Sequence, residues 1–156
     1  MSGAVERRVK AMRIAVGSDH RGFALKEGLK ELLGKLEHEW VDFGCQGDEP
    51  VDYPDIARPL AQAVARGEFD AGILVCGSGI GVSIVANKVK GVRAALCHDS
   101  WAGRRARQHN DANVLCLGSW CIGRGVAEDI VRAFLGAEFD GGRHKTRVDK
   151  IRAMES

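Results

Sequence analysis

The sequence AGILVCGSGIGVSIVAN, at residues 71–87, contains the pattern that decides the fold. Its first part, Ala71 to Cys76, is a continuous apolar run of strand length, which is typical of a strand buried on both faces. A glycine-rich turn follows, and Ile80, Ile84 and Val85 then recur at helical spacing. The segment therefore predicts a buried strand that passes through a tight turn into a helix.

The same alternation extends to both sides of this segment. Four further apolar runs have the length of strands, namely Met12–Gly17, His38–Asp42, Ala94–Cys97 and Val114–Leu117. Apolar residues recur at helical spacing between them, at Phe23, Leu25, Leu29, Leu32, Leu33 and Leu36 and again at Ile56, Leu60 and Val64. Alternating strands and helices require crossover connections, so we predict an α/β fold with a five-stranded, mostly parallel, Rossmann-like sheet. Ligands are then expected at the carboxyl ends of the strands.

Length and charge limit how the chain is organised and what it binds. We predict a flexible leader over residues 1–11 and a single domain over residues 12–156, because 156 residues suffice for one compact core. The tail is expected to form a C-terminal helix that packs Val148 and Ile151. A formal net charge of +2 creates no strong field for nucleic acid or an anionic membrane.

The cysteines and the hydropathy of the chain predict its compartment. Five cysteines are scattered along the sequence, an odd number that is typical of reduced thiols inside cells. No segment approaches the ~20 apolar residues that cross a bilayer. We therefore expect a cytoplasmic protein.

The turn from Gly77 to Gly81 is the first candidate for chemistry. Alternate glycines let successive backbone amides converge, and the start of the following helix adds its positive end, so the turn should hold an anion or an oxyanion. Its spacing departs from the dinucleotide fingerprint and from the P-loop, and neither motif explains Cys76 at its head. The alternative interpretation of Cys76 is a small buried residue that ends a strand.

Three other polar clusters have both a functional and a structural interpretation. Asp19 and His20 follow the first strand, where Asp19 could equally cap a helix. His109 could shuttle protons near neutral pH, although the polar residues around it also suit a helix end. Arg143 and Arg147 lie four residues apart, which fits a two-pronged grip on phosphate or a solvated basic helix.

In this order, these motifs resemble the ribose-5-phosphate isomerase B family, which includes subunits of galactose-6-phosphate isomerase. The matching stretches are Ser18-Asp19-His20, Asp52-Tyr53-Pro54, Cys76 to Gly81, Ala86-Asn87-Lys88, Gly91 to Ala94, Gln108 to Val114 and Gly141 to His144. The resemblance implies that a three-layer α/β/α sandwich, working as a homodimer or homotetramer, interconverts ribose 5-phosphate and ribulose 5-phosphate. The reaction would pass through an enediolate without a metal or another cofactor.

The resemblance also implies roles for individual residues. Cys76 would be the base, Ser78 would move protons at the substrate oxygens, and His109, helped by Asp19, would open the sugar ring. The expected substrate-binding groups are the amides of Gly77, Gly79, Ile80 and Gly81 and the side chains of His20, Asp52, Tyr53, Asn110, Arg143 and Arg147. Of these, Arg143 and Arg147 with His20 would hold the phosphate. The segment with His109 and Asn110 would reach across from a neighbouring subunit.

Two positions place the chain within the family. A second branch uses a glutamate as base at the position of Val82, and valine cannot titrate, so this sequence resembles the cysteine branch. Many relatives carry a phosphate-binding arginine from the partner subunit at the position of Trp120, and tryptophan has no charge to offer. Arg124 or another basic residue is then expected to compensate, or the substrate differs.

Three hypotheses compete with a ribose-5-phosphate isomerase. The same chemistry could act on allose 6-phosphate, galactose 6-phosphate or erythrulose 4-phosphate, with Trp120, His98 and Trp101 reshaping the pocket. A phosphosugar-binding module could keep the glycine turn and the arginines without catalysis. A flavodoxin-like nucleotide or flavin binder is the third, and it predicts a coloured protein or a melting point that nucleotides shift.

Overall fold

The computed structural model describes residues 10–155 of the chain. Its elements, in chain order, are β1 (Arg13–Ser18), α1 (Phe23–Lys35), β2 (Glu39–Asp42), α2 (Tyr53–Ala65), β3 (Ala71–Cys76), α3 (Ile80–Asn87), β4 (Ala94–Leu96), α4 (Ser100–Asn110), β5 (Val114–Gly118), α5 (Arg124–Leu135) and α6 (Arg143–Ala153). The α/β alternation that the sequence predicts is confirmed. Most of the predicted leader, residues 1–9, lies outside the described residues.

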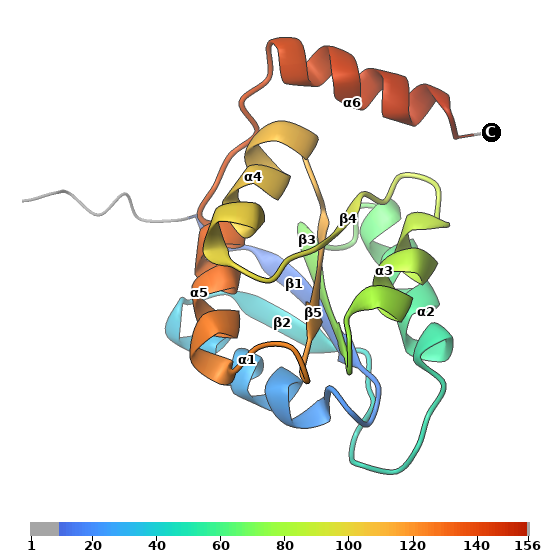
Figure 1. Cartoon of the computed structure of the whole chain (residues 1–156), viewed down its shortest axis with the longest axis vertical. Coiled ribbons are helices and arrows are strands. Elements are labelled where there is room, and N and C mark those ends of the chain that lie inside the picture. Colours follow the sequence, from blue (N-terminus) through green and yellow to red (C-terminus); the bar gives the residue numbers. More distant parts are fainter. Residues whose placement is uncertain (1–9, 156) are drawn as a thin grey trace, which may run out of the picture.

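The five strands form one sheet in the order β2-β1-β3-β5-β4, and each described pair of neighbours is parallel. Helices α1, α4 and α5 cover one face, whereas α2 and α3 cover the other (Figure 1). The core is accordingly split into two apolar layers, one on each face of the sheet. β3 lies at the centre and all six of its residues are buried, as its continuous apolar sequence predicts.

Helix α6 lies apart from these layers, at the edge of the sheet where β5 begins (Figure 1). Val148 packs inward with 2% of its surface exposed, as expected. The prediction that Ile151 also packs is wrong, because this side chain is 40% exposed. Ile151 lines an open hollow together with Lys90 and Arg93, so it is not enclosed as Val148 is.

None of the helices in the described part of the chain is long and apolar enough to cross a membrane.

Candidate active site

The candidate site lies where the strand order reverses. The chain leaves β1 toward β2 on one side and leaves β3 toward β4 on the other, so the ends of β1 and β3 flank the switch point of the sheet. Ligands of open α/β sheets bind in the crevice at such a point. Asp19 and Cys76 follow or end these two strands, and the Asp19 amide donates a hydrogen bond to the Val75 carbonyl at 3.2 Å. The sheet therefore brings both residues to one edge.

The glycine turn encloses the cysteine sulfur. Cys76 is only 4% exposed, and its Sγ accepts a hydrogen bond from the Gly79 amide at 3.1 Å. The Ser78 hydroxyl accepts one from the Ile80 amide, also at 3.1 Å. Gly79 has φ of +76°, and a Cβ there would lie 2.5 Å from Leu96 Cδ1, so only glycine closes this turn. The thiol and the hydroxyl thus share one set of backbone donors at the start of α3.

Two aromatic rings pack against the other glycines of the turn. A Cβ on Gly81 would lie 2.5 Å from Tyr53 Cζ, and a Cβ on Gly77 would lie 2.8 Å from Trp120 Cε3. Neither ring could approach so closely if these positions were alanine. The structure therefore places Tyr53, one of the expected substrate-binding residues, against the turn. It also places Trp120 beside Gly77 of its own chain, a contact that the resemblance did not imply.

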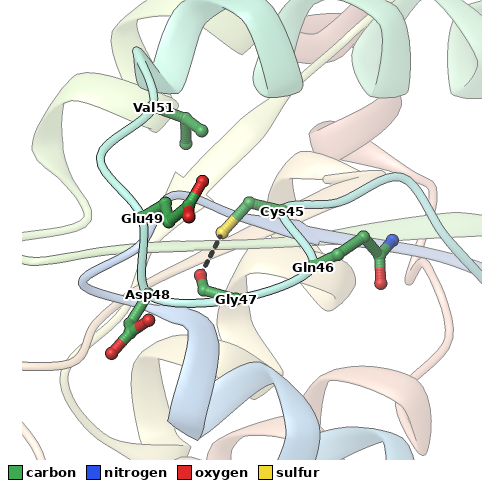
Figure 2. A pocket seen from close by; sticks show the side chains of 6 residues that line it. All are labelled: Cys45, Gln46, Gly47, Asp48, Glu49 and Val51. Atoms are coloured by element: carbon green, nitrogen blue, oxygen red, sulfur yellow. Dashed lines mark hydrogen bonds between the residues drawn. The ribbon is translucent and has the colours of Figure 1, made fainter.

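A loop between β2 and α2 forms the wall beside His20. His20 Nδ1 accepts a hydrogen bond from the Val51 amide at 3.2 Å. The loop surrounds a pocket of about 390 Å³ lined by Cys45, Gln46, Gly47, Asp48, Glu49 and Val51 (Figure 2). Cys45 Sγ donates a hydrogen bond to the Gly47 carbonyl at 3.1 Å inside this loop. The thiol therefore stabilises the loop and does not face the glycine turn. Asp52, at the end of the loop, is exposed and makes no capping bond to α2.

A buried lysine anchors the same loop from below. Lys26 is 1% exposed, and its Nζ donates to both carboxylate oxygens of Asp42 at 2.8 and 2.9 Å and to the Cys45 carbonyl. Burial alone would raise the pKa of Asp42, but hydrogen bonds from Lys26, Lys30 and the Gly44 amide hold it below its ordinary value. This anchor was not predicted from the sequence, although Lys26 lies within the apolar stripe of its helix.

The interpretation of Asp19 as a helix cap is wrong, because the N-cap of α1 is Gly22 and no side chain makes a capping bond there; Asp19 instead holds the turn that leads into the helix. Its Oδ1 accepts hydrogen bonds from the amides of Arg21 and Gly22, each at 3.0 Å, just before α1. The side chain is 4% exposed at the carboxyl edge of β1. Ser18 lies beneath it with a fully buried Oγ that lacks a hydrogen-bond partner within residues 10–155. Asp19 is therefore rigidly held next to the glycine turn.

The remaining predicted residues gather elsewhere. His109 lies in the last turn of α4 with its Nε2 at 3.9 Å from Asp140 Oδ2, and its ring stacks on His144 with centroids 4.0 Å apart. Burial lowers the pKa of His144, and the charges of His109, Arg143 and Arg147 lower it further. These four residues form a basic cluster between α4 and α6. Asn110, the last residue of α4, is exposed beside it.

The basic cluster and Cys76 lie at opposite ends of the strands: the cluster is beside their amino ends, and Cys76 is at their carboxyl ends. Gly72 pairs with Val114 and Cys76 pairs with Gly118, so α4 ends near the beginning of β5, about 13 Å of strand away from Cys76. Within one chain the structure does not bring His20 together with Arg143 and Arg147, so their joint binding of one phosphate stays a prediction. In a parallel sheet, residues after a strand and residues after a helix lie at different edges, which explains the separation.

The other thiols differ from Cys76 in position and exposure. Burial raises the pKa of Cys97 to about 11, with a further contribution from Asp99. Burial also raises the pKa of Cys116 strongly, with smaller contributions from Cys76 and Cys97. Cys121 is exposed, and all five cysteines of the chain are free. Cys121 is thus the natural comparison when thiol reactivity is measured.

Within residues 10–155, one group has the chemistry of a metal site. His109, Asp140 and His144 each offer one ligand atom, and these atoms lie within 4.8 Å of one another. The two imidazole rings are nearly parallel, 8° apart, and an imidazole binds a metal in the plane of its ring. One ion could not lie in both planes unless a ring turned, so the observed arrangement is a stacked pair.

The fold and the cysteine at its switch point define a class of enzyme that known proteins share. Residues 14–151 match the family model described as Ribose/Galactose Isomerase, and the chain belongs to this family. It is 48% identical to ribose-5-phosphate isomerase B of Escherichia coli over 92% of this chain and 96% of that protein.

A solved structure of Clostridium thermocellum ribose-5-phosphate isomerase B, 52% identical, matches with a TM-score of 0.91 over 92% of this chain and 97% of that one. The D-erythrulose-4-phosphate isomerase of Pectobacterium atrosepticum is 43% identical over 90% of this chain and 93% of that protein.

Proposed function

We propose that this chain is an aldose–ketose isomerase that interconverts ribose 5-phosphate and ribulose 5-phosphate, a reaction of the pentose phosphate pathway. The observation that carries the proposal is Cys76 at the switch point of the sheet, with its Sγ beside the Gly79 amide and the start of α3. Moving a proton between adjacent carbons needs a base and a site for the oxygen that gains charge. The turn offers both within three residues.

In the forward direction, the Cys76 thiolate would take the proton from carbon 2 of the open aldose and return it to carbon 1. The electron pair moves onto the carbonyl oxygen to form the enediolate, where the amides of Gly77, Gly79, Ile80 and Gly81 would stabilise the charge. The Ile80 amide is now bound to the Ser78 hydroxyl at 3.1 Å. Exchanging this partner for the substrate oxygen would free Ser78 to carry the proton between the two substrate oxygens.

We further propose that two copies of the chain build each active site, in a homodimer or a homotetramer. His109 would open the sugar ring and Asn110 would bind a sugar oxygen, yet both lie at the edge of the sheet away from Cys76. Arg143 and Arg147 lie with His109, whereas His20 and Asp19 lie with Cys76. A second copy that presents its basic cluster to this edge would unite the two sets.

The five free cysteines support a reducing compartment, so we place the reaction in the cytoplasm.

The chemistry is tested by measuring isomerisation of ribose 5-phosphate with EDTA present throughout. Turnover should fall at least a hundredfold in Cys76→Ala, on the order of what a general base contributes. Cys121→Ala is the matched control, because this thiol is exposed and lies outside the turn, and its turnover should equal the wild type. Turnover that survives in Cys76→Ala would refute the base, and turnover that EDTA abolishes would refute the metal-free reaction.

Sharing of the site is tested by mixing inactive variants. Cys76→Ala and His109→Ala chains, unfolded together and refolded, should recover about a quarter of wild-type activity, because half the dimers are mixed and each has one complete site. The control mixture is Cys76→Ala with Ser78→Ala, which both alter the same edge and leave no mixed dimer with an intact site. If the first mixture recovers no more than the control, His109 acts on the Cys76 of its own chain.

The second candidate is the same reaction on another sugar phosphate: allose 6-phosphate, galactose 6-phosphate or erythrulose 4-phosphate. The contact of Trp120 with Gly77 supports this candidate, because the ring narrows the path by which a substrate reaches the turn. The Pectobacterium relative also shows that the family includes an erythrulose phosphate isomerase. Comparing kcat/KM for the four substrates would decide, and a higher value for any sugar other than ribose 5-phosphate would replace the first candidate.

A further inference from the structure

Trp120 is held firmly over the glycine turn although most of its surface is exposed. The Ser119 amide donates to the Cys76 carbonyl and the Trp120 amide donates to the Gly77 carbonyl, both at 2.9 Å. The indole ring rests on Gly77, yet 69% of its surface remains accessible. The ring is therefore a fixed platform at the mouth of the candidate site.

Arg21 lies on this platform. Its guanidinium carbon is 4.6 Å from the centroid of the Trp120 ring, a distance typical of a cation–π contact. The backbone of Arg21 is fixed as well, because its carbonyl accepts a hydrogen bond from the Ser119 hydroxyl at 2.9 Å and its amide donates to Asp19 Oδ1 at 3.0 Å. The charge is thus one indole ring away from Gly77 and adjacent in sequence to His20.

The guanidinium of Arg21 forms no ion pair with any residue in the described range 10–155, and its side chain is exposed. Arg124, which the sequence analysis considered for a compensating charge, is in the opposite situation. It pairs with Glu31 at 2.8 Å and with Glu128 at 3.1 Å, and its side chain lies against Gly28 of α1. Of these two cations, Arg21 is the one that faces the site without a carboxylate.

From these contacts we infer that Arg21, oriented by Trp120, binds the phosphate group of the substrate at the rim of the site. An arginine offers a planar fork of donors that matches a phosphate, and stacking on an indole orients this fork before the ligand arrives. Arg21 and His20 would bind the phosphate together, both supplied by the chain that supplies Cys76. This inference rests on the proposed function for the identity of the substrate, but binding of a phosphate can be measured separately.

The test compares Arg21→Ala with the wild type in two measurements. The KM for ribose 5-phosphate and the inhibition constant of inorganic phosphate should each rise about tenfold, as for the loss of one charged hydrogen-bonding group. kcat should change less than threefold, and kcat/KM for unphosphorylated D-ribose should stay unchanged. Trp120→Leu keeps the charge of Arg21 but removes the ring that orients it. This variant should raise the KM for ribose 5-phosphate and the inhibition constant of phosphate about two- to fivefold.

Arg66→Ala is the matched control, because Arg66 is also exposed, lies at the far end of α2 and pairs only with Glu68 among the described residues. It should leave every constant unchanged. An inhibition constant for phosphate that Arg21→Ala does not alter would overturn the inference, as would an equal loss of activity toward D-ribose. If the wild type isomerises no sugar phosphate, the rise in Tm caused by inorganic phosphate still tests Arg21, because that rise should be lost in Arg21→Ala.

Discussion

Replacing Lys26 with methionine should destabilise the fold far more than replacing its neighbour Lys30. Lys26 is 1% exposed and donates three hydrogen bonds, two to Asp42 and one to the Cys45 carbonyl. Methionine fills a similar volume but leaves these acceptors short of a donor. Breaking a buried pair costs about 3–5 kcal/mol, and we expect about 3 kcal/mol because Lys30 and the Gly44 amide still bind Asp42.

Urea unfolding followed by circular dichroism measures this loss. For a chain of this length, about 3 kcal/mol corresponds to a fall of about 6–12 °C in Tm. Lys30→Met is the control, since Lys30 is 16% exposed and contacts the same carboxylate, and it should cost under about 1 kcal/mol. If Lys26→Met costs no more than Lys30→Met, the three hydrogen bonds do not anchor the loop and the reasoning fails.

Three further predictions use other features of the structure. Burial lowers the pKa of His38 below 6.5. As pH falls, the unfolded chain therefore binds the proton before the native state does, and the native state loses stability below about pH 6.5. Between pH 7 and pH 5 the free energy of unfolding should thus fall less in His38→Asn than in the wild type. Gly81→Ala would place a Cβ 2.5 Å from Tyr53 Cζ and should lower kcat/KM about tenfold, whereas Gly125→Ala, with open space around it, should change nothing. Ser18→Ala removes a buried hydroxyl that lacks a partner within residues 10–155, and should raise the free energy of unfolding by about 1 kcal/mol in urea titrations; a decrease would reveal a hidden partner of Ser18.

The sequence allowed the sheet to be predicted because its strands are signalled locally. Ala71–Cys76 is apolar throughout, and the predicted bounds of this strand are those observed. The packing of α6 was predicted only in part, because helical spacing shows that Val148 and Ile151 share a face but does not show what that face meets. Only the folded arrangement reveals that a packed surface ends beneath Val148 and an open hollow lies under Ile151.

Contacts between distant residues were beyond the reach of the sequence. Arg21 and Trp120 are almost a hundred residues apart, and no local pattern links them. The tyrosine and tryptophan rings explain why Gly81 and Gly77 are glycines, but the turn alone suggested only converging amides. Lys26 is different, because a lysine three residues before Leu29 and seven before Leu33 lies on the buried face of its helix. This spacing was a usable signal of a buried charge that needs an acid.

The division of the candidate residues between two edges also follows from the topology. Each strand delivers the residues after it to the carboxyl edge, where Asp19, His20 and Cys76 lie, and each helix delivers the residues at its end to the opposite edge, where His109 lies. One chain therefore cannot bring the His109 imidazole to its own Cys76 thiol without breaking the sheet. If both groups act on one substrate molecule, association of two chains is part of the catalytic machinery, and a well-folded monomer would bind the sugar at the turn without opening its ring.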